Sequence, residues 1–335
     1  MNPMLQGIGI ILIGLSGCIA YFYLSNLILD RVLFPARGPN AGRNINRANL
    51  WRPWLFMFPA IFALSLYLAY PVFETLRLSL MQRVAGGGYE WVGLNNYQRM
   101  MQDSKFWEAM RNNMLWLLVV PAAATGFGLL AAQLTDRIKW GGLAKSLIFM
   151  PMAISFVGAA VIWKLVYDAR PIDLEQIGIL NAIYLALGGA APQTWLTIPF
   201  WNNFFLMAVL IWIQTGFAMV ILSAALRGIP EETIEAAIVD GASGWQIFFK
   251  IKMPQIRSTI LVVWTTITII VLKIFDIVFA MTNGQWETQV LANYMFDKLF
   301  RANDWGVGSA SAMVIMILVT PILVWNVRNA RREMR

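Results

Sequence analysis

Hydrophobic residues in this chain form long runs that are separated by shorter polar segments. Seven of these runs reach about 20 residues, the length that a helix needs to cross the hydrocarbon core of a bilayer. They predict seven transmembrane helices, which makes the fold class all-α and the chain a polytopic membrane protein. The predicted spans are Met4–Leu29, Trp54–Leu80, Asn113–Leu134, Leu143–Tyr167, Asn203–Leu226, Ser258–Met281 and Gly306–Val327.

The polar segment between the fifth and sixth runs, residues 227–257, has a helical pattern of its own. Pro230 suits the first turn of a helix, because its missing N–H is not needed there. Gly241 falls where helices commonly end in the left-handed conformation. Between them, apolar residues recur at the spacing of one helix face, namely Ile234, Ala237 and Ile238.

A second short helix is predicted directly after the first. Ser243 and Gln246 have the spacing of a capping box, which marks a helix start. The pattern predicts that Pro254 ends this helix, after an apolar face made of Ile247, Phe248 and Ile251. Two short helices with exposed apolar surface on a membrane loop indicate that a partner covers them. The alternative is an ordinary amphipathic helix that lies at the membrane surface.

Composition supports the membrane assignment. Hydrophobic residues make up 59% of the chain and charged residues 13%, and the mean hydropathy is +0.60. Soluble domains carry about 25% charged residues. The chain has no histidine and one cysteine, Cys18, within the first apolar run. A zinc site, a metal-dependent reaction and a Ser–His or Cys–His catalytic pair are therefore not expected. No phosphate-binding loop of the G-x-x-x-x-G-K-[ST] type occurs, so the chain is not expected to bind ATP in that way.

The net charge of +8 follows from the distribution of Lys and Arg among the polar segments. With seven spans, most of the 26 basic residues fall on the same side of the membrane as residues 227–257. That side also carries the arginine-rich segment before Pro53 and the tail after Val327. The positive-inside rule places that side in the cytoplasm, so the N-terminus is expected outside and the C-terminus inside. This distribution explains the charge without a nucleic-acid partner.

The segment 227–257 resembles the EAA loop of ABC-importer permeases. The resemblance rests on Glu235-Ala236-Ala237, three residues, Gly241, nine residues, and then Ile251-Lys252-Met253-Pro254. The family pattern ends in I-x-L-P, and Met253 takes the place of the leucine here. The match of both motif and spacing between two apolar runs makes the resemblance specific.

Further segments resemble sugar permeases of the maltose type. They are Leu272–Asp276 and Met281–Gly284 in the sixth run, and Ile148–Pro151, Ile162–Lys164 and Gly178–Asn181 before it. The stretch from Asn283 to Asn293 looks closer to the α-glucoside branch. The resemblance covers about Trp54 to the end. It implies two parts: residues 1–53 as an added transmembrane helix with a cytoplasmic linker, and 54–335 as the permease domain with its coupling loop at 227–257.

The resemblance implies the type I ABC-importer permease fold, a six-helix core with one helix added before it. Such a permease is a non-catalytic subunit of the bacterial inner (plasma) membrane, in contact with membrane lipid. It would form a heterodimer with a second permease, an ATPase dimer would bind ATP and Mg, and a periplasmic or extracellular solute-binding protein would deliver the sugar. The residues implied in coupling to the ATPase are Glu235, Ala236, Ala237, Asp240, Gly241, Ile251 and Pro254.

Polar residues inside the predicted spans are candidates for the substrate path, because such residues usually face a cavity or another helix. Lys273 and Asp276 are three residues apart and are predicted on one helix face, where they form either a polar wall or a structural ion pair. Gln214 with Phe217 offers an amide and an aromatic ring to a sugar, or holds two helices together. The resemblance to the maltose permease adds positions near Met152, Phe156, Ile213, Val271 and Ile274.

Two other function classes compete with an ABC permease. A self-contained secondary transporter or channel is expected to have internal repeats with discontinuous helices in matching halves, and the sequence has no such repeat. A membrane-embedded enzyme is expected to cluster carboxylates or histidines at a membrane interface, and the sequence lacks such a cluster. The sequence therefore favours an importer subunit for an oligosaccharide or glucoside.

Overall fold

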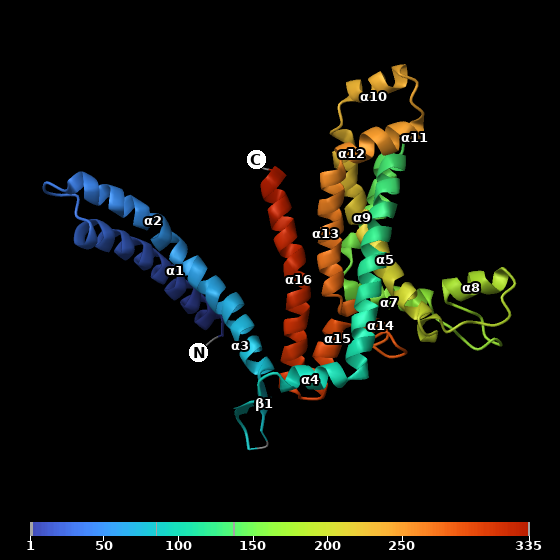
Figure 1. Ribbon diagram of the computed structural model, residues 1–335, viewed down its shortest axis with the longest axis horizontal. Helices are drawn as coiled ribbons and strands as arrows, with labels where there is room; N and C mark the ends of the chain where they lie inside the picture. Colours follow the sequence, from blue (N-terminus) through green and yellow to red (C-terminus); the bar gives the residue numbers. More distant parts are fainter. Residues whose placement is uncertain (1–2, 85, 137, 334–335) are drawn as a thin grey trace. The chain divides into compact units, whose positions relative to one another are not determined.

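The computed structural model describes residues 3–84, 86–136 and 138–333, and it is helical almost throughout (Figure 1). By its internal contacts the chain divides into two compact units, Met1–Glu74 and Thr75–Arg335. The all-α prediction is confirmed, apart from one short β-hairpin. The two units are described in turn.

The first unit is a pair of helices joined by residues 34–40. The helix predicted from Trp54 onward already begins at Ala41 and runs through Pro53, so the segment predicted as a polar linker is in part helical. A proline inside a helix kinks it without always ending it, and here the chain continues into a π-helical turn. The elements are α1 (Pro3–Ile28), the π-turn η1 (Leu29–Leu33), α2 (Ala41–Leu64), the π-turn η2 (Ser65–Ala69) and α3 (Tyr70–Ser79), whose last turn enters the second unit.

Aromatic contacts and one ion pair hold the two helices of the first unit together. The Tyr21 ring stacks on Phe58 at a centroid distance of 6.4 Å, and its hydroxyl donates to the Leu55 carbonyl at 2.9 Å. Arg52 of α2 forms an ion pair with Asp30 of η1 at 2.7 Å. Most other side chains of α1 and α2 are apolar and exposed, as expected of helices whose surroundings are lipid or another membrane chain.

The second unit is a bundle built around the long helices α5, α9, α13 and α16 (Figure 1). One end carries α10–α12 and is called the α10 end; the other carries the hairpin β1–β2, α4 and α15 and is called the α4 end. Its elements are β1 (Met81–Arg83), β2 (Tyr89–Trp91), α4 (Asn95–Gln102), α5 (Ser104–Thr135), α6 (Gly141–Phe149), the 3-10 turn η3 (Met150–Ala153), α7 (Phe156–Val166), α8 (Ile179–Ala186), the 3-10 turn η4 (Trp195–Thr197), α9 (Trp201–Arg227), α10 (Glu231–Val239), α11 (Gly244–Gln246), the π-turn η5 (Ile247–Lys252), α12 (Met253–Gln255), α13 (Arg257–Leu272), α14 (Asp276–Met281), α15 (Leu291–Phe296), the π-turn η6 (Asp297–Arg301) and α16 (Trp305–Glu333).

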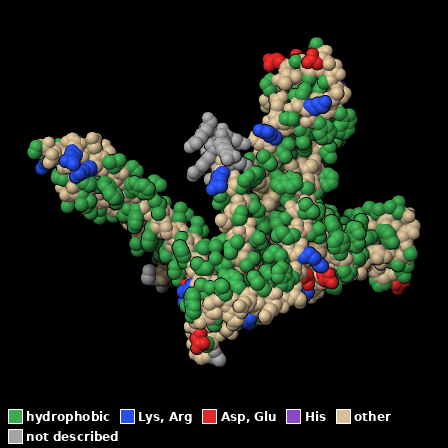
Figure 2. All heavy atoms as spheres, viewed as in Figure 1, with side chains coloured by type: hydrophobic (Ala, Val, Ile, Leu, Met, Phe, Trp, Pro, Cys, Tyr) green, Lys and Arg blue, Asp and Glu red, His purple; other side chains and the backbone are tan. Residues whose placement is uncertain are grey.

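The described residues contain five helices that are long and apolar enough to cross a membrane. The number rises to seven if each of two sharply bent helix pairs counts as one span, which agrees with the seven predicted. The bends are 106° between Gly141–Ala153 and Phe156–Val166, and 70° between Gly244–Gln255 and Arg257–Leu272. Figure 2 shows hydrophobic side chains along the flanks of the second unit.

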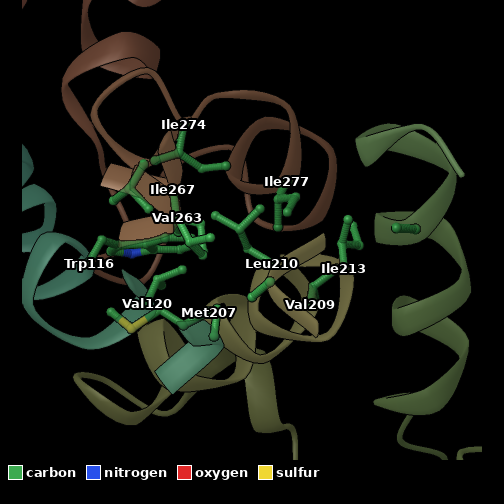
Figure 3. Close-up of a cluster of buried hydrophobic side chains, with 14 of the residues drawn as sticks. Trp116, Val120, Met207, Val209, Leu210, Ile213, Val263, Ile267, Ile274 and Ile277 are labelled. Atoms are coloured by element: carbon green, nitrogen blue, oxygen red, sulfur yellow. The ribbon is translucent and has the colours of Figure 1, made fainter. Parts of the chain in front are cut away.

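The core of the second unit lies where α5, α9 and α13 meet. Trp116 and Val120 of α5 pack against Met207 and Leu210 of α9 and Ile267 of α13, all fully buried (Figure 3). The close approach of α5 and α9 depends on Gly128, because a Cβ atom there would overlap the Cβ of Ala218. This packing fixes both ends of the bundle, where the irregular segments lie.

Candidate functional site: the loop at the α10 end and the broken helices

Helix α10 ends in the left-handed turn that the sequence predicts. Gly241 has a φ of +76°, the Gly241 N–H donates to the Ile238 carbonyl at 3.0 Å, and the Ala242 N–H donates to the Ala237 carbonyl at 2.9 Å. This pair of bonds is the Schellman motif, which favours glycine at this position. Pro230 precedes α10 as its N-cap, one residue before the predicted first turn.

The second short helix starts as predicted and ends later than predicted. Ser243 and Gln246 form a reciprocal capping box, in which each side chain bonds the other residue's backbone N–H. The prediction that Pro254 stops this helix is wrong: the helical path runs to Gln255 and breaks at Ile256. Proline is tolerated because it lies in the first turn of α12, where its absent N–H is not missed.

The loop of residues 228–256 buries one apolar face and exposes another. Ala237 and Ile247 are buried, Ile251 is half-buried, and α10 packs against η5. The side chains of the loop that pack against the core of the bundle are Ile234, Phe248 and Met253. The side chains at the tip are largely uncovered, with Val239 86% and Trp245 75% exposed. Of the residues predicted to couple to a partner, the exposed ones are Glu235, Ala236, Asp240, Gly241 and Pro254.

A charged cluster holds the base of this loop. The Arg227 guanidinium, at the end of α9, donates to Asp136 Oδ1 through Nε at 3.0 Å and Nη2 at 2.9 Å. Lys145 of α6 bonds the same carboxylate, and Ser223 donates to it at 3.2 Å. Burial alone would raise the pKa of Asp136, but the hydrogen bonds from Lys145 and Arg227 hold its pKa below its ordinary value. The carboxylate therefore stays ionised and ties the end of α5 to the end of α9 and to the middle of α6.

The fourth predicted span is broken at Ile154 and Ser155, and the break packs on α9. A Cβ atom at Gly216 would lie 2.6 Å from the Ile148 carbonyl oxygen, so this glycine lets α9 approach the end of α6. Non-helical backbone at membrane depth occurs where it is enclosed by protein or lines an aqueous cavity. Two candidate path residues flank the break: Met152 is 40% exposed, and Phe156 is half-buried against the core.

Three of the apolar residues predicted on the path lie in the core instead. Ile213, Val271 and Ile274 are each at most 2% exposed, and Figure 3 shows Ile213 and Ile274 among the packed core side chains. Burial of apolar side chains stabilises the folded protein, which accounts for the place of these residues in the core. A place for these three residues on the substrate path stays a prediction.

The other two candidates on α9 are a buried amide and a partly exposed aromatic ring. Gln214 is 3% exposed and its Oε1 has no hydrogen-bond partner, whereas Phe217 is half-buried against the core. An unpaired buried amide oxygen costs about 1–3 kcal/mol. A group left in this state is a candidate for an interaction made elsewhere in a transport cycle.

Lys273 and Asp276 do not share a helix face, contrary to the prediction. Helix α13 ends at Leu272 and α14 begins at Asp276, with a turn at Lys273 and a residue at Phe275 that is neither helical nor extended. The break removes the i, i+3 geometry, and no ion pair joins the two described side chains. Lys273 is exposed and borders a cavity of about 390 Å³ lined by apolar and aromatic residues. Two of the predicted spans are therefore discontinuous among the described residues, the fourth at Ile154–Ser155 and the sixth at Lys273–Phe275, and neither break was evident from the sequence.

At the α4 end, side-chain amides hold a strained loop that sequence reasoning missed. In residues 282–290, Asn283, Trp286 and Glu287 have φ between 54° and 63°, which non-glycine residues rarely adopt. The Asn112 amide donates to the carbonyls of Glu287 and Gln289 at 2.8 Å each, and Asn202 donates to that of Trp286 at 2.5 Å. The asparagines lie 84 to 177 residues away in sequence, so no local pattern reveals the arrangement.

The chain is similar in sequence to known membrane proteins. The family model for the binding-protein-dependent transport system inner membrane component matches residues 124–334. The α-glucoside transport system permease protein AglF of Rhizobium meliloti is 64% identical and covers 99% of both chains. The osmoprotective compounds uptake permease protein GgtC of Synechocystis sp. is 48% identical and covers 83% of this chain and 99% of its own.

Among solved structures, a bacterial ABC transporter involved in the import of the acidic polysaccharide alginate has a similar fold. The TM-score is 0.72 at 20% identity, over 88% of this chain and 99% of the other. A second structure of the alginate transporter, with a TM-score of 0.72 at 19% identity over 88% of this chain and 99% of that one, is in complex with an alginate pentasaccharide-bound periplasmic protein. At this identity the likeness concerns the fold alone.

Proposed function

Because the chain belongs to the family of binding-protein-dependent transport system inner membrane components, we propose that it is the permease subunit of an ABC importer that carries an α-glucoside or a related oligosaccharide into the cell. The relative at 64% identity, matched over almost its whole length, supports the substrate class. As a permease the chain performs no covalent chemistry of its own.

The observation that carries the proposal is the loop of residues 228–256. Its inner face packs on the bundle, whereas its tip exposes large apolar side chains that a partner is needed to cover. We assign this tip to the ATPase subunits, with Ala237 and Ile251 anchoring the loop and Glu235, Ala236, Asp240, Gly241 and Pro254 forming the contact surface. The ATP and Mg²⁺ would be bound by those subunits.

The remaining assembly follows from the same proposal. A second permease subunit would complete the path, as a heterodimer, and a solute-binding protein would dock at the α4 end, opposite the loop of residues 228–256. The loop would lie in the cytoplasm with the C-terminus, and the N-terminus would lie outside, which agrees with the distribution of Lys and Arg. Residues 1–53 would be an added helix with its connection, and 54–335 the permease domain.

The two broken helices suggest how the path changes. ATP binding would move the loop, and the charged cluster at Asp136 would pass this movement to α5, α6 and α9 together, because one carboxylate at the end of α5 bonds side chains of the other two helices. The bundle would then switch between inward-open and outward-open states. Gln214, Phe217, Met152 and Phe156 lie on or beside the α6–α7 break, where such a change would expose them to the sugar.

The experiment that tests this function is reconstitution of the permease pair, the ATPase and the binding protein in vesicles. We expect uptake of labelled maltose, used as the probe α-glucoside, to require both ATP and the binding protein. Uptake driven by an ion gradient without ATP would instead support a secondary transporter, a class that also uses discontinuous helices.

A further inference from the structure

Four phenylalanines form a continuous row beside the break between α13 and α14. The rings of Phe275 and Phe279 stack at a centroid distance of 4.9 Å, and Phe296 lies 5.3 Å and 5.2 Å from them. Phe300 extends the row at 5.0 Å from Phe296. These residues come from two separate segments of the chain, so the row is formed only in the folded bundle.

The row lies on a surface and not in the core. None of the four side chains belongs to either core cluster of the described residues, and Phe300 is 64% exposed. Phe275 and Phe296 also form a wall of the cavity of about 390 Å³ that Lys273 borders. This volume falls within the range of about 300–1,000 Å³ that small-molecule sites occupy.

Lys273 indicates that this face meets water and not lipid. Its side chain is exposed and forms no ion pair with any described residue, although it lies at the break within a predicted span. An ammonium group without a partner is costly in hydrocarbon, so residues of this kind almost always face a bundle interior or a water-filled cavity. The aromatic row next to it therefore faces the same space.

Polar groups follow one edge of the row. The Arg301 guanidinium lies 5.8 Å from the centre of the Phe279 ring and 5.9 Å from that of Phe296. It also donates to Asn283 Oδ1 at 2.8 Å and pairs with Asp297 at 3.0 Å. Aromatic faces thus lie beside hydrogen-bonding groups, at the end of the bundle assigned to the solute-binding protein.

We propose that Phe275, Phe279, Phe296 and Phe300 form a stacking track for the pyranose rings of the transported sugar, leading from the α4 end toward the cavity at Lys273. A pyranose ring has apolar C–H faces and a polar rim, so it packs on an aromatic ring while its hydroxyls bond the groups at the edge. This inference rests on the proposed function, and it assigns contacts that lie on α14, α15 and η6, away from α6, α7 and α9.

The first test is access to the row from water, in the assembled transporter. In a Cys18→Ser background, Phe300→Cys should react with a membrane-impermeant thiol reagent, and saturating maltose-loaded binding protein with non-hydrolysable ATP should slow the reaction. Phe127→Cys, which replaces a phenylalanine 55% exposed on the flank of α5, is the matched control and should stay unreactive. An unreactive Phe300→Cys would mean that lipid or the second permease covers the row, which overturns the proposal.

The second test separates the aromatic faces from simple apolar bulk. Phe296→Leu should lower maltose uptake roughly three- to tenfold, the scale of a lost aromatic contact, whereas Phe296→Tyr should retain it. ATP hydrolysis stimulated by the loaded binding protein should persist in both variants, and Phe127→Leu should transport normally. Equal uptake in Phe296→Leu and wild type would refute the track. Absence of uptake in the wild type itself would refute the proposed function instead.

Discussion

The loop at the α10 end and the loop at the α4 end both interrupt the long helices of the bundle. They differ in the contacts that hold their backbone and in the side chains that they leave exposed. At the α10 end, residues 228–256 satisfy their backbone with a Schellman turn and a capping box and leave apolar side chains uncovered. At the α4 end, Asn112 and Asn202 hold the backbone of residues 282–290, and strained residues persist because of those bonds. The comparison shows that the backbone of residues 282–290 is held by side chains of this chain, whereas residues 228–256 leave an apolar surface open to the proposed partner.

The largest effect is expected at Gly241, because it combines strain with the loss of a partner surface. Gly241→Asp places a Cβ at a φ of +76°, which costs about 1–2 kcal/mol, and adds a charge beside Asp240. Transport should fall close to background, and the ATPase should co-purify poorly at normal expression. Gly244→Asp is the matched control, since Gly244 also has open space for a Cβ but does not need the left-handed conformation. Normal transport in Gly241→Asp would show that the loop is only a surface helix.

Asn112 should give the next largest effect, and it acts through the chain's own stability. Asn112→Leu leaves the buried Gln289 carbonyl without this donor, at about 1–3 kcal/mol, and leaves the Glu287 carbonyl with the Asn203 amide at 3.3 Å. We expect a lower unfolding temperature in detergent and faster proteolysis at residues 282–290, while the ATPase still co-purifies. If Asn112→Leu lowered both ATPase binding and stability, the loop at the α10 end would depend on the loop at the α4 end.

Asp136 tests whether the base of the α10-end loop is held by charge. Asp136→Asn keeps the shape but removes the ionic partner of Lys145 and Arg227, and should cost about 1–3 kcal/mol. Uptake should fall more than ATP hydrolysis does, because the loop still docks but its movement reaches α5, α6 and α9 less well. An equal fall in both rates would assign Asp136 a purely structural role.

The same carboxylate has a defined pH dependence. Its pKa in the folded protein lies below the ordinary value, so its stabilising contribution is complete above that ordinary value and is lost only as the pH falls through the lowered one. Coupling of uptake to ATP hydrolysis should therefore be the same at pH 5.5 and pH 7.5 as far as Asp136 is concerned. A change that disappears in Asp136→Asn would contradict the lowered pKa.

Gln214 should give the smallest change in stability. Replacing the amide, whose Oε1 has no partner, by leucine removes an unsatisfied buried group and should leave the unfolding temperature unchanged or slightly higher. Uptake should nevertheless fall if the amide meets the sugar in another state of the path. Unchanged uptake in Gln214→Leu would leave the amide without a role in transport.

The sequence predicted what is local and missed what depends on distant contacts. Gly241 and the capping box at Ser243 were predictable, because the backbone requirements lie within a few residues of one another. The break at Lys273 was not, since no glycine or proline marks it and the run of apolar residues continues across it. Ile213 and Val271 are apolar, so the sequence alone does not distinguish a buried core position from a position on the substrate path.

Tertiary pairings account for most of the remaining features. Asn112 and Glu287 are 175 residues apart, and the phenylalanine row joins two segments that meet only in the folded bundle. The charged cluster at Asp136 likewise joins side chains from α6 and α9 to the end of α5. Lys and Arg at helix ends are expected of any membrane protein, so composition gave no reason to single these residues out.

The central claim, that the α10-end loop docks on the ATPase, is tested most directly by site-specific cross-linking. Val239 at the tip of the loop and Leu187, which follows α8, are apolar and almost equally exposed, at 86% and 84%. Each is replaced by cysteine in a Cys18→Ser background and treated with a short thiol-to-amine cross-linker in the assembled, transport-active complex. We expect a cross-link to the ATPase from Val239→Cys and none from Leu187→Cys. A complex that transports sugar but gives no ATPase cross-link from Val239→Cys, or gives one only from Leu187→Cys, would contradict it.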